Sequence, residues 1–583
     1  MPNLLAMSFE GALAPSFDLR CLHPGRTPPD GWGLGYYPGG EPSATVLKEP
    51  APPLGSIRSE LVKAWEHLES SLFLVHIRTA TWGAATGANT QPFARTWGRR
   101  DWLFAHSGSL RERPAAQPGR LFEPVGSTDT EAVLCELLNR VAAHGWSSLG
   151  EADPAELLRW FGGLNELGSL TSVLTDGHDL LVYADRDPQA RGVWIWEALP
   201  PYARLALSDD DVVVDLARRG PKSRKGIVIA SEPLQVDSDW QGTWRRIPPG
   251  HLLLVREGAV RLEQAPAQEA PQLDIGGLVR ARRLVRPAQT PVGRYDVVHR
   301  TVYRYERPVE RSMHMFRLRP VHDDLQTLEA FDLAVSAGGV MCDYQDVFGN
   351  AVRRLDVDTP FSEMVVEARS RVAVLDRDPL SYRPRRERTT IPLVWMPWQR
   401  QVLQPFLLPE ELPQSELEEL IEYAMSFVKR NDFDLLDTLL DMNESIHREY
   451  RYVQGATNLL TTPFETYVNR QGVCQDFTNL FMCLARLLSI PARYVCGYLY
   501  TGPKAENVAQ GEASHAWAQV YLPSVGWRGF DPTNGVITQT NHVRVAVGRS
   551  WRDATPTSGT IYVGGAGETL SVDVRVTPAA NAG

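Results

Sequence analysis

A cysteine at the start of an expected helix is the residue with the clearest chemical potential in this sequence. Cys474 precedes apolar side chains at helical spacing over residues 477–488, and the Ile-Pro pair at 490–491 ends that pattern. The first N–H groups of a helix have no intrahelical partner and the helix dipole is positive there, so both stabilise a thiolate. Cys474 is therefore the candidate nucleophile, whereas Cys483 and Cys496 lack this placement and are interpreted as small core residues.

A histidine and an aspartate flank an expected β-hairpin farther along the chain. An alternating strand pattern begins at His515, a Pro-Ser-Val-Gly turn occupies residues 523–526, and the returning strand ends at Asp531. With the hairpin centred near residue 523, the two side chains become close cross-strand neighbours, although a one-residue bulge would change this register. The carboxylate would orient the imidazole, and the imidazole would deprotonate the Cys474 thiol. These residues predict a Cys–His–Asp catalytic set.

Length and composition exclude several classes of protein. The 583 residues predict about three or four domains. Hydrophobic residues make up 43% and charged residues 22%, as in soluble globular proteins, and the net charge of −10 disfavours nucleic-acid binding. We find no apolar run long enough for a transmembrane helix and no secretion signal, so we expect a cytoplasmic protein without a membrane partner. The six cysteines show no CxxC pair and no ligand spacing, so we expect no disulfide framework and no metal site.

Composition and periodicity divide the chain into four segments. Residues 258–293 combine prolines with four arginines between positions 280 and 286, and are interpreted as a linker that follows an N-terminal domain at 1–257. Alternating β-branched and aromatic residues predict a β-rich domain over residues 294–392. Helical spacing followed by further strands predicts an α+β core over residues 393–583.

The last two segments resemble the bacterial transglutaminase-like superfamily, from about residue 294 to residue 575. The resemblance rests on VVHRTVYRYERPV (297–309), GVCQDF (472–477), IPARYVCGYL (490–499), SHAWAQVYLPSVGWRGFDPTNG (514–535) and HVRVAVGRSW (542–551). It implies a papain-like core with Cys474 as nucleophile, His515 as base and acid, and Asp531 as the orienting residue. It also implies acyl transfer from amides through a thioester to an amine or to water, and we expect no cofactor.

The N-terminal segment resembles a different family, the class II glutamine amidotransferases. Five motifs occur in the family's order: DGWG (30–33), HIR (76–78), NTQPF (89–93), AHSGSL (105–110) and GSTDTE (126–131). The resemblance implies an αββα sandwich of the N-terminal-nucleophile-hydrolase type over residues 1–257. The fold class expected for the whole chain is therefore α+β multidomain, with this sandwich, a middle β domain and a papain-like transglutaminase core.

Two positions that the amidotransferase family uses for catalysis differ in this chain. The family needs a cysteine directly after the initiator methionine, and this chain has Pro2, which carries no thiol. The family also holds its oxyanion with an Asn-Gly pair, which here is Ser107-Gly108. By contrast, Arg78 and Asp129 match the residues that hold the carboxylate and the α-amine of glutamine. These residues, together with Gly108, are the candidate substrate-binding residues of a domain that we expect to be inactive.

Three interpretations of the N-terminal domain stay open. It binds an amino acid or a γ-glutamyl group, it is a scaffold in which Arg78 and Asp129 are ion partners, or it retains glutaminase activity. Cys21 is not expected to restore that activity, because it lacks the adjacent free amine.

The leading hypothesis is a thiol enzyme that acts on amide or isopeptide bonds of a peptide or protein. Glutamine or a γ-glutamyl group is the expected acyl donor, and the N-terminal domain would hold the substrate or a partner. The resemblance also associates such proteins with peptide ligases, so members of a peptide-ligase pathway are expected partners. The alternative from a different class is a non-enzymatic assembly or regulatory protein in which both halves are docking modules.

Overall fold

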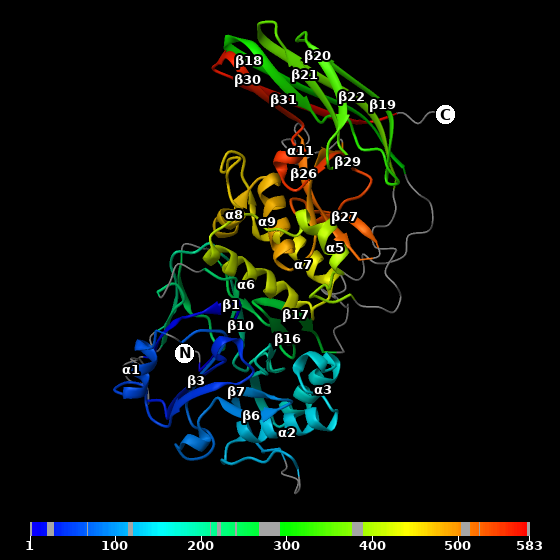
Figure 1. The fold of residues 1–583 in the computed structure, drawn as a ribbon. Helices are drawn as coiled ribbons and strands as arrows, with labels where there is room; N and C mark the ends of the chain where they lie inside the picture. Colours follow the sequence, from blue (N-terminus) through cyan, green and yellow to red (C-terminus); the bar gives the residue numbers. More distant parts are fainter. Residues whose placement is uncertain are drawn as a thin grey trace. The chain divides into compact units, whose positions relative to one another are not determined.

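The computed structural model describes residues 3–19, 28–66, 68–114, 120–209, 212–218, 223–238, 242–266, 292–375, 389–502, 514–523 and 525–579. The chain folds into two units, residues 1–285 and 286–583, whose helices and strands are drawn in Figure 1. Each unit has its own hydrophobic cores. Pro2, Cys21 and most of the expected linker lie outside the described residues.

Two large antiparallel sheets form the centre of the first unit. The first sheet has the order β15-β10-β13-β1-β5-β3-β4 and consists of β1 (Leu4–Leu13), β3 (Gly31–Tyr36), β4 (Thr45–Glu49), β5 (Ser70–Arg78), β10 (Trp194–Ala198), β13 (Gly226–Ala230) and β15 (Arg245–Arg246). The second has the order β17-β16-β9-β8-β7-β6 and consists of β6 (Phe93–Trp97), β7 (Arg100–Leu110), β8 (Gly168–Thr175), β9 (Asp179–Tyr183), β16 (Leu252–Arg256) and β17 (Ala259–Gln264). Apolar side chains of both sheets share one core, to which Leu74 of β5 and Val173 of β8 belong.

Further layers cover the outer faces of these two sheets. Helices α2 (Asp129–Ala143) and α3 (Pro154–Asn165) pack on the second sheet, with Leu134 and Phe161 in one cluster with Phe104. The first sheet is covered by α1 (Ile57–Ala64) and a small sheet with the order β14-β11-β12-β2, made of β2 (Ser16–Leu19), β11 (Leu205–Ser208), β12 (Val212–Asp215) and β14 (Gln235–Ser238). This arrangement confirms the αββα class. Much of one outer layer is a sheet rather than helix, because alternate residues of β11 and β12 supply the apolar cover.

A β region opens the second unit. It contains β18 (Val292–Phe316), β19 (Gln326–Val335), β20 (Val340–Gln345), β21 (Ala351–Val357) and β22 (Phe361–Leu375) in the order β19-β22-β18-β21-β20. In β22, Val366, Ala368 and Val372 point to the buried face while charged neighbours face outward, as the alternation predicts.

The last two strands of the chain return to this β region. β30 (Thr557–Ala566) pairs with the second half of β18, and β31 (Thr569–Pro578) pairs with its first half (Figure 1). The expected division into a β domain at 294–392 and a core at 393–583 is therefore corrected, because 557–578 belong to the β region. Periodicity identifies a strand but does not identify the strand with which it pairs.

The core of the second unit packs helices against a five-stranded sheet. The helices are α5 (Pro397–Leu403), α6 (Gln414–Arg430), α7 (Leu435–Glu449), α8 (Pro463–Asn469), α9 (Cys474–Leu487) and α11 (Trp551–Ala554). The sheet has the order β28-β27-β26-β25-β29 and consists of β25 (Ala492–Leu499), β26 (His515–Leu522), β27 (Gly526–Asp531), β28 (Val536–Ile537) and β29 (His542–Gly548), and a parallel pair is formed by β23 (Arg451–Tyr452) and β24 (Gln471–Gly472). Leu480 and Leu484 of α9 share a core with Ala518 of β26. The papain-like α+β class is confirmed.

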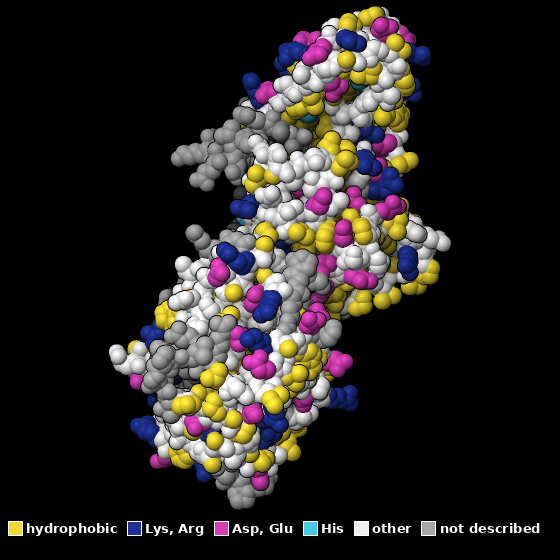
Figure 2. All heavy atoms as spheres, turned by 90° about the vertical axis from the view of Figure 1, so that its left-hand side faces the viewer, with side chains coloured by type: hydrophobic (Ala, Val, Ile, Leu, Met, Phe, Trp, Pro, Cys, Tyr) yellow, Lys and Arg dark blue, Asp and Glu magenta, His cyan; other side chains and the backbone are white. Residues whose placement is uncertain are grey.

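The described helices include none that is both long and apolar enough to cross a membrane. On the face drawn in Figure 2, basic and acidic side chains are interspersed among hydrophobic ones, so neither sign of charge dominates that face.

Candidate active site

Helix α9 begins at Cys474, the residue that the sequence nominated as the nucleophile. The Cys474 side chain is half-buried. The turn before it is held by Asp476, whose Oδ2 accepts hydrogen bonds from the Val473 N–H at 2.8 Å and the Thr457 hydroxyl at 2.6 Å. Because the carboxylate is itself buried, these bonds fix the direction in which the helix leaves the preceding strand.

The first N–H groups of α9 are available to a bound group. The N–H groups of Asp476 and Phe477 both bond to the Val473 carbonyl. Within the described part of the chain, the N–H groups of Cys474 and Gln475 have no acceptor. They can therefore donate to an oxyanion that forms beside the sulfur.

A buried arginine anchors the segment that leads to Cys474. Arg470 adopts a left-handed conformation, with φ of 50°, at the C-terminus of α8. Its guanidinium lies 4.8–4.9 Å from the ring centres of three tyrosines, Tyr423, Tyr450 and Tyr467. A cation enclosed by three aromatic faces cannot move without losing all of these contacts, so it fixes the backbone four residues before the thiol.

The hairpin that carries His515 and Asp531 has a slightly different register from the expected one. Ala518 of β26 faces Phe530 of β27, which places Asp531 opposite Trp517. His515 and Asp531 are therefore diagonal neighbours on one face rather than directly opposite each other. The reach of the two side chains closes this distance, and the His515 Nε2 lies 2.9 Å from the Asp531 Oδ2.

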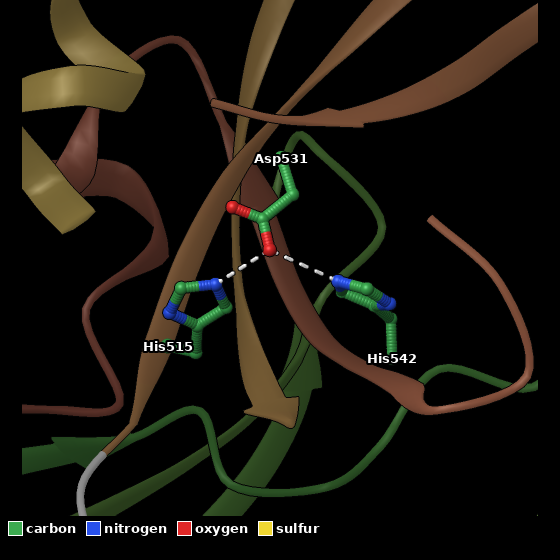
Figure 3. Close-up of side chains that lie close together, drawn as sticks. All are labelled: His515, Asp531 and His542. Carbon is green, nitrogen blue, oxygen red and sulfur yellow. Dashed lines mark hydrogen bonds and ion pairs between the residues drawn. The ribbon is translucent and has the colours of Figure 1, made fainter. Parts of the chain in front are cut away.

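Asp531 is a buried carboxylate surrounded by donors (Figure 3). Its Oδ2 accepts hydrogen bonds from the Nε2 atoms of His515 (2.9 Å) and His542 (3.1 Å) and from the Asn534 amide (2.7 Å). Its Oδ1 accepts from the backbone N–H groups of Thr533 (3.0 Å) and Asn534 (3.2 Å). This number of donors matches a carboxylate that stays ionised inside the protein.

His515 and Asp531 stabilise each other's charged form. Burial alone would lower the pKa of His515, but the Asp531 carboxylate and its hydrogen bond raise it to about 10, and a hydrogen bond with Cys474 acts in the same direction. Burial would raise the pKa of Asp531, but the charge of His515 and the bonds from both imidazoles hold it well below its usual range. His515 is therefore an imidazolium at neutral pH, next to the Cys474 thiol, which can form an ion pair with it as a thiolate.

His542 is the functional residue that sequence reasoning missed. It stands at the start of β29, eleven residues after Asp531, and the sequence contained no signal for its contact beyond its place in the motif at 542–551. His515, Asp531 and His542 each have one atom that could bind a metal ion, and these three atoms lie within 4.8 Å of one another. Sequence spacing did not indicate this set. The N···O distances of 2.9 and 3.1 Å are those of ordinary N–H···O hydrogen bonds.

The other cysteines of this unit have a different environment. Cys483 and Cys496 are buried, and burial raises the pKa of both thiols to about 12. Both are protonated near neutral pH, which agrees with their interpretation as core residues.

In the first unit, Arg78 lies at the end of β5 and is buried. Its Nη2 donates to the carbonyls of Trp82 (2.9 Å) and Gly83 (3.0 Å). Its Nη1 is buried and has no acceptor among the described residues. Burial lowers the pKa of this guanidinium, although the charge of Asp30 opposes the shift. A ligand carboxylate could accept a hydrogen bond from this unpaired Nη1 and pair with the positive charge of the guanidinium.

Asp129 and Gly108 lie on neighbouring elements of the same unit. Asp129 begins α2, and its two carboxylate oxygens accept from the backbone N–H groups of Leu110 and Thr130, both at 2.8 Å. Gly108 has a φ of +146°, and a Cβ there would lie 2.4 Å from the Ser169 carbonyl oxygen. The structure therefore gives Asp129 and Gly108 local structural roles, and it records no bond between Asp129 and Arg78 among the described residues.

Ser107, which occupies the position of the family's asparagine, bonds to the start of the chain. Its hydroxyl donates to the Asn3 Oδ1 at 2.7 Å, and the hydroxyl of Ser231 donates to the same oxygen at 3.0 Å. Ser107 and Ser231 thus hold Asn3, the residue that precedes β1.

Three family models match the chain. The model for class II glutamine amidotransferases matches residues 1–275, that for the bacterial transglutaminase-like N-terminal region matches residues 295–373, and that for the transglutaminase-like superfamily matches residues 423–532. The chain is therefore a fusion of a class II glutamine amidotransferase region with a bacterial transglutaminase-like region. Its fused halves correspond to the two resemblances that the motifs indicate.

Several curated proteins are similar to parts of this fusion. It is 28% identical over 261 residues to an uncharacterized protein of Methanocaldococcus jannaschii, which covers 44% of this chain and 70% of that protein. It is 30% identical over 302 residues to an uncharacterized protein of Mycobacterium tuberculosis, covering 49% and 93% of the two chains. It is also 30% identical over 224 residues to the glutamine amidotransferase candidate YafJ of Escherichia coli, covering 37% and 84%.

Solved structures also align with parts of the chain. A candidate cysteine protease from Cytophaga hutchinsonii aligns with a TM-score of 0.40 at 22% identity and covers 49% of this chain and 93% of its own. A predicted glutamine amidotransferase from Pseudomonas aeruginosa aligns with a TM-score of 0.35 at 27% identity and covers 45% and 99%.

Proposed function

We propose that the second unit is a thiol enzyme that transfers an acyl group from an amide or isopeptide bond of a peptide or protein. The observation that carries this proposal is the buried His515 imidazole, whose Nε2 lies 2.9 Å from the Asp531 Oδ2 and which is also hydrogen-bonded to the thiol at the start of α9. A buried imidazole whose pKa is raised next to a thiol is the arrangement that generates a thiolate at neutral pH. Cys483 and Cys496 lack any such partner, which supports a specific role for Cys474.

The proposed reaction has two halves. The Cys474 thiolate attacks the carbonyl carbon of the amide, and the N–H groups of Cys474 and Gln475 bind the oxygen as it becomes negative. His515 gives its proton to the leaving amine as the C–N bond breaks, which leaves a thioester. Water or a second amine then attacks the thioester and gives its proton to His515, and the C–S bond breaks to release the acyl product.

Thiol labelling tests the existence of this site. Near neutral pH, iodoacetamide should alkylate Cys474 much faster than Cys483 or Cys496, and His515→Ala should slow only the Cys474 reaction. Equal and slow labelling of all three cysteines would contradict the proposal and would favour a non-enzymatic protein with two docking modules.

Mass spectrometry tests the reaction itself. The full chain and its Cys474→Ala variant are incubated with a library of γ-glutamyl and isopeptide-linked peptides, with and without an amine acceptor. We expect hydrolysed or amine-linked products and an acylated chain with the wild type only. Products that also form with Cys474→Ala would assign the reaction to another residue.

We propose a second, non-catalytic role for the first unit: it binds an amino acid or γ-glutamyl group through Arg78. The buried, unpaired Nη1 of Arg78 favours this role over a pure scaffold. Glutamine or a γ-glutamyl peptide should raise the melting temperature of the full chain, and Arg78→Ala should abolish the shift. Ammonia release from glutamine would instead indicate retained glutaminase activity.

A further inference from the structure

His542 shares the carboxylate of Asp531 with His515. Its Nε2 lies 3.1 Å from the Asp531 Oδ2, and Figure 3 shows the carboxylate between the two imidazoles. His542 is 3% exposed, and its ring packs edge-on against Trp517 at 5.2 Å, so the imidazole has no room to rotate. The contact is therefore a fixed part of the site rather than a chance approach of two surface groups.

The direction of this hydrogen bond follows from the chemistry of the partners. An ionised carboxylate only accepts, so the Nε2 of His542 must carry the proton that it shares with Asp531. The Nδ1 of the same ring lies 2.9 Å from the Asn541 Oδ1, which accepts, and 3.4 Å from the backbone N–H of Gln539, which donates. The bond to Asp531 therefore places a proton on the Nε2 of His542, whichever of these two partners Nδ1 bonds to.

The other donors to Asp531 differ from His542 in where they come from. Thr533 and Asn534 lie two and three residues after Asp531, in the turn that follows β27. Among the described residues, His515 and His542 are the donors that reach the carboxylate from other strands, β26 and β29. His542 therefore ties Asp531 to β29, a strand outside the β26–β27 hairpin and the turn that follows it.

We propose that His542 is a positioning residue for the acyl transfer proposed above. Its Nε2–H holds the Asp531 carboxylate in the orientation that directs the His515 ring toward Cys474. The inference rests on the proposed function, since it concerns the same site, but it assigns a role to a residue that takes no part in the chemical steps.

Two substitutions separate the donor from the bulk of the side chain. His542→Phe keeps a flat ring against Trp517 but removes the donor, whereas His542→Gln places an amide N–H near the position of Nε2. In the full chain, His542→Phe should slow alkylation of Cys474 by iodoacetamide about tenfold, because a hydrogen bond to a charged group is lost. His542→Gln should restore the rate to within about threefold of the wild type.

Two further readouts exclude a merely structural effect. Cys483, which is 2% exposed, reports loosening of the fold, so its alkylation should stay slow in both variants. NMR of the chain with ¹⁵N-labelled histidine should show a downfield Nε2–H signal for each imidazole that bonds to Asp531. His542→Gln should keep the His515 signal, and His542→Phe should shift or broaden it.

The outcomes are distinct. A His542→Phe variant that labels as fast as the wild type with an unchanged His515 signal would overturn the inference. Equal loss in both variants, with fast labelling of Cys483, would also overturn it and assign His542 to the fold. Slow labelling of Cys474 in the wild type itself would contradict the proposed function rather than the role of His542.

Discussion

At the scale of single residues, the site depends on two charges that are both costly to bury alone. Asp531 and His515 are almost fully buried, at 0% and 2% exposed. Each would be driven to its neutral form by burial, and each is kept ionised by the other. Removing one partner therefore changes the protonation of the other as well as the contact between them.

The first prediction is that Asp531→Asn removes the pH dependence that this pair gives to stability. The pKa of His515 is about 10 in the folded chain, whereas a histidine in an unfolded chain has an unperturbed pKa of about 6.5. The stabilisation is therefore fully present below pH 6.5 and is lost as the pH rises toward about 10. In urea titrations, the stability difference between the wild type and Asp531→Asn should shrink between pH 6.5 and pH 10.

The same variant should also lose reactivity at Cys474. Without the carboxylate, burial lowers the pKa of His515, so the imidazolium is lost at neutral pH and alkylation of Cys474 slows. A stability difference that stays constant or grows with pH would show that the carboxylate does not hold the charge of His515.

Sequence reasoning reached some residues of the site but not others, for a physical reason. Cys474 is marked by local features, namely a helix start and an apolar helical repeat. His515 and Asp531 are marked by strand alternation and a turn. His542 meets them only because β29 lies in the same sheet, and the order of strands in a sheet is not encoded in the periodicity of any one strand.

At the scale of elements, the close contact between β24 and α9 gives the second prediction. A Cβ added to Gly472 would lie 2.8 Å from the Asp476 side chain, which is buried and bonded to Val473 and Thr457. Gly472→Ala should therefore displace the first turn of α9, destabilise the second unit by about 1–3 kcal/mol and slow alkylation of Cys474.

A matched substitution controls for the change from glycine to alanine itself. Gly338 has no atom within 4 Å of an added Cβ, so Gly338→Ala should leave both stability and labelling close to the wild type. Iodoacetamide labelling and urea denaturation measure the two effects. Unchanged Cys474 labelling in Gly472→Ala would show that the start of α9 tolerates the displacement.

Elements also show where the sequence stopped being informative. Strand and helix positions around the site were predicted closely, including the start of α9 and the hairpin from His515 to Asp531. The register of the hairpin and the return of β30 and β31 to β18 were not, because both depend on which backbone groups pair across the sheet. The alternation within one strand does not name its partner strand, and a small shift in the position of a turn changes the register.

At the scale of the whole molecule, the two units have separate cores. No hydrophobic cluster of the described residues contains side chains from both 1–285 and 286–583. Within the second unit, one cluster joins the β region to the core of helices and five-stranded sheet: Val574 of β31 packs with Tyr498 of β25 and Val543 of β29. The end of the chain therefore stabilises the unit that holds the site.

The third prediction is that Val574→Ala destabilises the second unit alone. Val574 is 2% exposed, and the loss of two buried methyl groups should cost about 2 kcal/mol. Val572 lies on the same strand but is 39% exposed, so Val572→Ala should change stability by less than about 0.5 kcal/mol.

Buried thiols report the two units separately in this experiment. Cys135 is buried in the first unit and Cys483 in the second, so each is alkylated only when its own unit opens. In moderate urea, Val574→Ala should speed alkylation of Cys483 and leave that of Cys135 unchanged. Because the cores are separate, the reciprocal Val228→Ala, in the first unit, should speed alkylation of Cys135 and leave that of Cys483 unchanged. Parallel acceleration of both thiols by either variant would mean that the units unfold as one.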